Sequence, residues 1–230
     1  GLYDRDYGRA DQTPWDRVQK PRSMTVTLII INVVVFLFSM LFFNNGSSGS
    51  ESFDILGFFG FVPDTLFEPW KWWQFLTYGF FHDLNSPFHI LFNMIMLYVF
   101  GRMVEARMGA GEFLRFYLLA IVIGGIIGAT TGLAMDYIPT AAETGREVMS
   151  TPPTIGASGG VLALVVMFAC YFPQQELFLW GIIKLKAWVL AALCVGMDLL
   201  GSIYSLAGGE TSTAFTVHMA GAGFALAYHY

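Results

Sequence analysis

A serine within a glycine-rich run is the residue of this chain best suited to chemistry. Ser158 lies in Thr-Ile-Gly-Ala-Ser-Gly-Gly (154–160), directly before an apolar stretch that is broken by Pro173. The fourteen residues from Ser158 to Tyr171 make a helix of about 21 Å, whereas a membrane's hydrocarbon core is about 30 Å thick. Such a helix starts below the membrane surface, where non-helical backbone is tolerated only inside protein or beside a wet cavity. This geometry predicts a nucleophile sheltered inside the bilayer.

Three other polar side chains lie in apolar segments at a similar depth. His89 and Asn93 are spaced i and i+4 and therefore share one helix face, and His218 lies near the outer end of the last segment. Such side chains are costly in a membrane, so they usually face the bundle interior and often mark function. A lone membrane histidine is more often structural, but four polar groups at one depth favour a site. The face of His218 also carries small residues that permit close helix approach: Gly221, Ala222 and Ala225.

The composition is that of a membrane protein. Hydrophobic residues make up 55% of the chain, charged residues 13%, and the mean hydropathy is +0.57, which argues against a soluble globular domain. Cys170 and Cys194 both lie in apolar segments, so we interpret them as buried apolar residues rather than a disulfide pair. We expect no cofactor, no metal site and no nucleic-acid partner.

Six hydrophobic segments are predicted to span the membrane: 24–43, 88–104, 113–135, 156–172, 185–204 and 213–230. With residues 1–23 as a polar cytoplasmic tail, the loop charges obey the positive-inside rule. Lys71 and Arg146 fall outside, whereas ten cations fall inside: Arg5, Arg9, Arg17, Lys20, Arg22, Arg102, Arg107, Arg115, Lys184 and Lys186. Both termini are then cytoplasmic, and the mouth of the Ser158 helix faces the outer side.

The connection 44–87 is predicted to be a structured outer loop rather than a flexible linker. It opens with Asn-Asn-Gly-Ser-Ser-Gly-Ser and then becomes rich in aromatic residues, including Trp70, Trp72 and Trp73. Tryptophan and tyrosine favour the headgroup level of a membrane. We therefore expect this loop to lie partly in the outer leaflet, within a membrane domain that covers 24–230.

Four motifs in this order resemble the rhomboid family of intramembrane serine proteases. Gly156-Ala-Ser158-Gly is similar to the family's Gly-x-Ser-Gly, His89-x-x-x-Asn93 to its second-helix motif, and His218-x-x-Gly221 to its sixth-helix motif. Three further runs are also typical of the family: Thr77-Tyr-Gly-Phe-Phe-His82, Gly101-Arg-Met-Val-Glu105 and Asn32-Val-Val-Val-Phe36. The resemblance covers about 24–230 and implies an all-α bundle of six transmembrane helices with a structured first outer loop.

The resemblance has departures that remove no reacting group. Gln74 stands where the family often has arginine after tryptophan, and Lys71 is the nearest cation. Leu162 occupies a position that is often aromatic, and Ala225 replaces a second glycine on the last helix. These changes affect the expected anchoring of the loop and the packing around His218.

The implied chemistry is peptide-bond hydrolysis by a Ser158–His218 dyad. Serine is a weak nucleophile that needs a neighbouring base, and we assign His218 that role. Asp198 is the nearest carboxylate, near the outer end of its segment, and we interpret it as structural. His89, Asn93 and the backbone N–H of Ser158 are the expected stabilisers of the oxyanion.

Two other functions compete with a protease. An inactive rhomboid-like protein that binds or escorts membrane helices is the first, but such relatives usually lack the serine or the histidine. A small channel or transporter is the second, but neither inverted repeats nor a continuous polar stripe is evident. We therefore expect an enzyme of the plasma or inner membrane that acts on single-pass transmembrane proteins within the lipid bilayer.

Overall fold

The computed structural model describes residues 23–43, 54–137, 152–179, 183–206 and 213–230. Within these ranges the longer helices are α2 (Met24–Phe43), α5 (Pro87–Met108), α6 (Ala110–Tyr137), α7 (Ser158–Tyr171), α8 (Ala187–Leu206) and α9 (Thr213–His229). Each falls on one of the predicted hydrophobic segments. The expected tail at 1–23 lies almost wholly outside the described residues.

Three of these helices are long and apolar enough to cross a membrane. They are Met24–Phe43, Pro87–Met108 and Ala110–Ala134, and two shorter apolar helices, Ser158–Tyr171 and Ala187–Gly201, accompany them in the described chain. The predicted short helix from Ser158 to Tyr171 is confirmed residue for residue. It ends where Pro173 cannot continue the helical hydrogen bonds.

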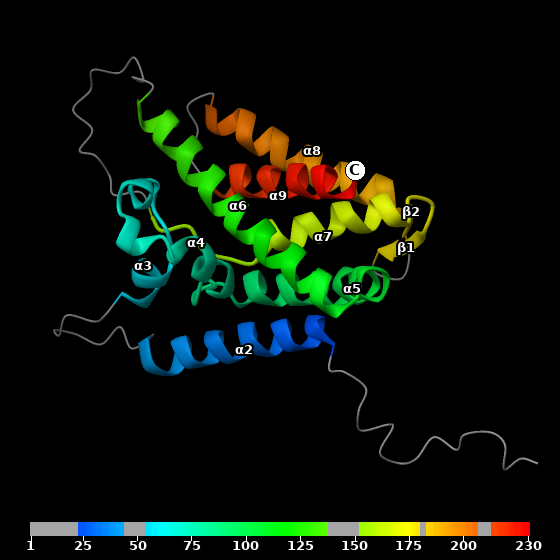
Figure 1. Ribbon diagram of the computed structural model, residues 1–230, viewed down its shortest axis with the longest axis horizontal. Helices are drawn as coiled ribbons and strands as arrows, with labels where there is room; N and C mark the ends of the chain where they lie inside the picture. Colours follow the sequence, from blue (N-terminus) through cyan, green and yellow to red (C-terminus); the bar gives the residue numbers. More distant parts are fainter. Residues whose placement is uncertain (1–22, 44–53, 138–151, 180–182, 207–212) are drawn as a thin grey trace, which may run out of the picture.

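Helix α7 is the centre of the bundle. All residues from Gly159 to Ala169 are buried, and α5, α6, α8 and α9 pack around the helix. A helix that is apolar on every side is suited to such a surrounded position, because it has no polar face to present to water. Figure 1 shows that α7 begins in the interior, between the two ends of the bundle, as its short length requires.

Helix α2 lies along the outside of the bundle and packs mainly on α5 (Figure 1). The Glu105 carboxylate of α5 accepts hydrogen bonds from the backbone N–H groups of Met24, at 2.7 Å, and Thr25, at 3.0 Å. These N–H groups belong to the first turn of α2 and have no partner within their own helix. A carboxylate at that end also complements the helix dipole, so Glu105 fixes the register of α2 against α5.

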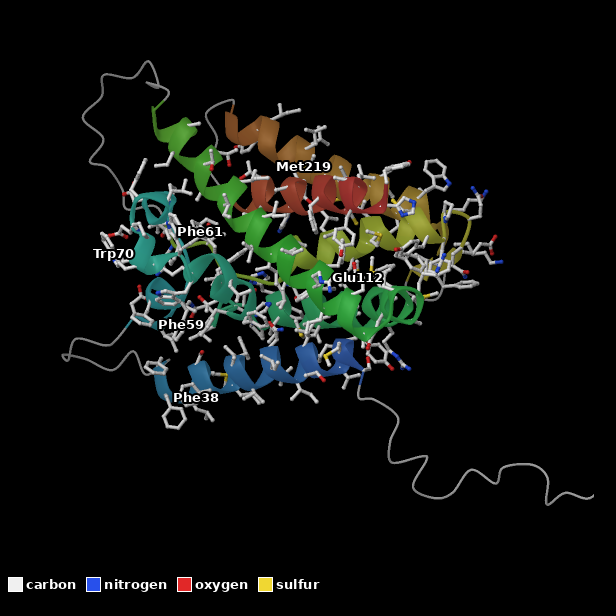
Figure 2. All side chains as sticks on the ribbon, viewed as in Figure 1. Phe38, Phe59, Phe61, Trp70, Glu112 and Met219 are labelled. Carbon is white, nitrogen blue, oxygen red and sulfur yellow. The ribbon has the colours of Figure 1, made fainter. Side chains whose placement is uncertain are left out.

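The segment 54–86 is a folded scaffold of short helices. It contains α3 (Ile55–Phe59), η2 (Pro63–Phe67), η3 (Pro69–Lys71), α4 (Gln74–Thr77) and η4 (Tyr78–Phe80). The Gln74 amide donates to the Phe58 carbonyl at 2.8 Å and accepts from the Thr65 hydroxyl at 3.0 Å. Figure 2 shows Phe59, Phe61 and Trp70 of this segment close together at the left of the view. The predicted loop is thus folded over residues 54–86, whereas its place on the outer side stays a prediction and residues 44–53 lie outside the described residues.

The described residues also form a small β-hairpin, which the sequence did not predict. Strand β1 (Glu176–Leu179) pairs antiparallel with β2 (Ile183–Lys186), with Leu177 opposite Leu185 and Phe178 opposite Lys184. Leu177 packs against the core, whereas Phe178 is exposed. The predicted hydrophobic segment 185–204 includes Leu185 and Lys186, the last two residues of β2, because a short apolar run with lysines suits either structure. Cross-strand pairing decided in favour of the strand.

The two ends of the bundle differ in their elements. The hairpin, the beginning of α2 and the end of α9 lie at one end, and α3 and α4 lie at the other (Figure 1). The start of α7 therefore opens toward the half of the bundle that holds the scaffold of residues 54–86.

Candidate active site

Ser158 and His218 meet between α7 and α9. The Ser158 Oγ lies 2.6 Å from Nε2 of His218, within the range of a short O–H to nitrogen hydrogen bond. Ser158 is the first residue of α7, and His218 follows the first turn of α9. This contact is the nucleophile–base arrangement that serine chemistry requires.

Glycines explain how the two helices come so close. A Cβ built on Gly221 of α9 would lie 2.3 Å from the Gly159 carbonyl oxygen of α7, and a Cβ on Gly159 would lie 2.8 Å from Val217. Neither glycine could carry a side chain without separating the helices. The predicted small face of α9 is thus confirmed at Gly221, and Ala222 and Ala225 are buried beside it.

The segment before Ser158 is held by the scaffold of residues 54–86. Phe61 and Thr154 exchange backbone hydrogen bonds, and the Gly156 N–H donates to the Tyr78 carbonyl at 2.9 Å. Gly156 has φ of 121°, a conformation that glycine adopts without steric cost. The scaffold therefore sets the direction from which the chain enters α7 and presents Ser158.

His82 supports the same turn from inside the scaffold. Its Nε2 accepts the Ala157 backbone N–H at 3.5 Å, and only 1% of the residue is exposed. Burial, together with the neighbouring His89, lowers the pKa of His82 to about 3, because a desolvated imidazolium is unfavourable. His82 is therefore a neutral acceptor at ordinary pH, a role that its place in the Thr77–His82 run did not specify.

His89 and Asn93 lie next to Ser158, as their shared helix face predicted. A Cβ on Gly156 would be 2.9 Å from the His89 ring and 3.6 Å from the Ser158 Oγ. The Asn93 amide donates to the His89 carbonyl at 2.8 Å, a bond that uses one of its two N–H groups. The structure therefore brings Ser158, His218, His89 and Asn93 into one region.

A cavity of about 340 Å³ adjoins Ser158. The cavity is lined by Ser158 and by five residues on one face of α5: Phe88, His89, Phe92, Asn93 and Met96. Phe88 and Phe92 are 65% and 57% exposed on the outer surface of the bundle. The cavity thus joins the polar site to a surface that is apolar enough to face lipid.

Backbone donors also point to this region. The first N–H groups of a helix have no intrahelical acceptor, and in α7 these belong to Ser158, Gly159 and Gly160. The positive end of the helix dipole lies at the same place. Such donors can stabilise negative charge that develops on an oxygen bound at Ser158.

Sequence reasoning did not place Asp198 in the site. The Asp198 Oδ1 of α8 lies 2.8 Å from Nδ1 of His218, on the opposite side of the ring from Ser158. The sequence predicts only a structural role for Asp198, because no motif connects it with the histidine. Its position inside an apolar helix was the available signal, since intramembrane carboxylates usually face a partner.

The departures from the resemblance each have a local explanation. Gln74 is buried and joins Phe58 to Thr65, so it anchors the scaffold through an amide. Lys71 forms an ion pair with Glu68 at 2.6 Å and not with the site. Leu162 is buried in the core of the bundle.

Comparison with known proteins agrees with the motifs. The model of the Rhomboid domain matches residues 69–230. The chain is 31% identical to "Rhomboid protease GluP" of Bacillus subtilis over 121 residues, which are 53% of this chain and 22% of that protein. It is 26% identical to "RHOMBOID-like protein 12, mitochondrial" of Arabidopsis thaliana over 216 residues, 92% of this chain and 59% of that protein.

A third relative is "Rhomboid protease GlpG" of Haemophilus influenzae, 29% identical over 93 residues, 40% of this chain and 38% of that protein. The chain therefore spans less than two thirds of the length of each of these curated relatives. The family model, in contrast, covers most of the chain. By this match, this integral membrane protein belongs to the rhomboid family.

Proposed function

We propose that the chain is an intramembrane serine endopeptidase that cleaves transmembrane protein substrates. The observation that carries this proposal is the 2.6 Å contact between the Ser158 Oγ and His218 Nε2 at the buried start of α7. Relatives with the names GluP and GlpG are rhomboid proteases, which supports the same activity here.

The reaction follows from the positions of the groups. The Ser158 Oγ attacks the carbonyl carbon of the scissile peptide bond while His218 Nε2 accepts the hydroxyl proton. The Ser158 N–H, Asn93 and His89 stabilise the oxyanion. His218 then returns its proton to the leaving amine, which leaves an acyl-enzyme. Water, deprotonated by His218, attacks the ester carbonyl and releases the acid and the free serine.

The cavity supports a substrate that arrives from the membrane. Its walls include Phe88, Phe92 and Met96, and the first two are exposed on the side of α5 away from the core. An apolar side chain of a single-pass helix can enter this cavity from lipid without first crossing water. The carbonyl of a helical peptide bond is already hydrogen-bonded within its helix. The substrate helix must therefore unwind locally before its carbonyl can bind the polar groups beside the cavity.

The orientation that we propose has six spans, both termini in the cytoplasm and a site open to the outer side. The positive-inside distribution of lysine and arginine supports it. The beginning of α2 and the end of α9 also lie at the same end of the bundle (Figure 1), as an even number of spans requires. A plasma or inner membrane is the proposed location.

The test is labelling and cleavage with a matched pair of serine variants. Ser158→Ala is expected to abolish cleavage of a helical membrane substrate in liposomes and labelling by a fluorophosphonate. Ser39→Ala, which changes a buried serine of α2, is expected to retain both. Equal labelling of wild type and Ser158→Ala would overturn the proposal. Substrate binding without cleavage by wild type would instead indicate an inactive rhomboid-like escort.

A further inference from the structure

A further polar group contacts His218 from another helix. Asp198 lies in α8, whereas Ser158 begins α7 and His218 belongs to α9. The Asp198 Oδ1 is 2.8 Å from His218 Nδ1, and the two side chains are only 17% and 21% exposed. The imidazole is therefore contacted at both ring nitrogens, by a carboxylate on one side and by the serine hydroxyl on the other.

The carboxylate determines which nitrogen carries the proton. An ionised carboxylate only accepts hydrogen bonds, so His218 Nδ1 must be the protonated donor in this contact. In a neutral imidazole Nε2 then has its lone pair free to accept the proton of Ser158. A hydrogen bond to a charged acceptor is also stronger and more directional than a neutral one, so it fixes the ring plane.

We propose that Asp198 is a positioning residue that holds His218 in the tautomer and orientation needed to activate Ser158. This inference rests on the proposed protease function and adds Asp198 to the Ser158–His218 pair. The Asp198 carboxylate contacts the base and neither the nucleophile nor the cavity beside it. Its effect should therefore fall on the chemical step rather than on substrate binding.

The packing of α8 on α9 is suited to this role. A Cβ on Gly201 would lie 2.5 Å from the Phe215 ring. Gly201 is three residues after Asp198, and Phe215 is three residues before His218. Residues three apart are neighbours on a helix face, so this close contact lies one turn from the carboxylate–imidazole pair. Gly201 thus lets the Phe215 ring of α9 lie directly against α8 beside the pair.

The first experiment compares Asp198→Asn with a matched carboxylate change. Asp198→Asn keeps the side-chain shape but can donate to Nδ1 and favour the wrong tautomer. We expect kcat and the rate of fluorophosphonate labelling of Ser158 to fall by about 10² to 10⁴-fold, with KM unchanged. Glu112→Gln, which alters a carboxylate that contacts α9 through Tyr228 at the opposite end of the helix, should label at the wild-type rate. Asp198→Glu should recover at least about tenfold over Asp198→Asn, because it restores an acceptor-only group.

A second pair of variants tests the same contact without changing a polar group. A Cβ on Gly201 would lie 2.5 Å from the Phe215 ring, so in Gly201→Val the ring or the helix must shift, whereas a Cβ on Gly196 of the same helix meets no heavy atom within 4 Å. We expect Gly201→Val to label at least about tenfold more slowly than Gly196→Val, because displacement of about 1 Å at a reacting group has large effects on rate. This pair remains informative if Asp198→Asn does not fold.

The outcomes separate this inference from the proposed function. If wild type neither cleaves nor labels, the protease function itself is wrong. If wild type labels and folded Asp198→Asn labels at the same rate, Asp198 has no positioning role and the function stands. Equal labelling of Gly201→Val and Gly196→Val would likewise overturn the positioning role.

Discussion

At the residue scale, the proposed site combines a serine, which is a weak nucleophile by itself, with groups able to activate it. Ser158 is presented by a helix start, where three consecutive N–H groups lack intrahelical acceptors. His218 lies within hydrogen-bond distance of its hydroxyl. In the proposed mechanism Ser158 and His218 act as one unit, so removal of either should have nearly the same effect as removal of both.

We expect His218→Ala to lose as much activity as Ser158→Ala, and the double variant to be scarcely slower than either single variant. The measurement is kcat/KM for one helical substrate in liposomes, with Ser39→Ala as a control for a serine change elsewhere in the membrane region. Losses that add clearly in the double variant would show that the two residues act independently.

Asn93→Ala should slow turnover by about 10² to 10³-fold and leave Ser158 open to labelling, since removal of one oxyanion donor typically costs that much. His89→Ala should be more severe, because the His89 ring also packs on Gly156 and edge-on against His82, at 5.1 Å between ring centroids. Single-turnover kinetics and labelling rates provide the measurement. Wild-type turnover in a folded Asn93→Ala, His89→Ala double variant would refute the assignment of these residues to the oxyanion.

At the element scale, the crossing of α7 and α9 determines whether the serine and the histidine meet. The contact between Gly221 and the Gly159 carbonyl leaves no room for a Cβ. The atom that a Cβ would meet is a backbone oxygen, which cannot move aside as a side-chain tip can. Small residues at membrane helix crossings allow this approach. The two helices thus form a rigid unit around the site.

Gly221→Ala should destabilise the protein by about 1–3 kcal/mol through overpacking and slow the labelling of Ser158, because α9 must move away from α7. Gly223→Ala is the matched control: it lies two residues along the same helix, and a Cβ there meets nothing within 4 Å. Thermal unfolding in detergent and labelling rates distinguish the two variants. Similar behaviour of both would mean that the crossing does not depend on Gly221.

At the scale of the whole molecule, the segment 54–86 and the helical bundle stabilise one another through the turn before Ser158. Phe61, Tyr78 and His82 each hydrogen-bond backbone of residues 154–157. The protonation of His82 therefore bears on the stability of the whole fold, because the buried ring must be neutral to accept the Ala157 N–H.

Acidification should destabilise the protein through His82. Between the ordinary pKa of 6.5 and the folded pKa of about 3, the unfolded state carries the extra proton, so stability falls as pH falls. The slope approaches about 1.4 kcal/mol per pH unit, and we expect a loss on the order of 2 kcal/mol between about pH 6 and pH 4. His82→Gln, whose side-chain oxygen can accept but does not titrate, should lack this slope. Unfolding free energies in detergent at both pH values measure it, and equal slopes would contradict the prediction.

The sequence by itself determined the long apolar helices and the candidate reacting residues. The bounds of α7 followed from a glycine-rich start and Pro173, and the shared face of His89 and Asn93 followed from their i, i+4 spacing. These are local properties, because helical periodicity and helix ends depend on residues that are close together in the sequence. The hairpin was missed because strand pairing joins residues whose individual preferences are ambiguous.

Only the tertiary structure decided which side chains meet across helices. Asp198 lies twenty residues before His218. The sequence of neither segment predicts that these two side chains of α8 and α9 contact each other. The same holds for His82 with Ala157 and for Gly201 with Phe215. Each contact depends on the rotation of a helix about its axis and on the crossing angle with its neighbour, and those are set by packing of whole surfaces rather than by local sequence.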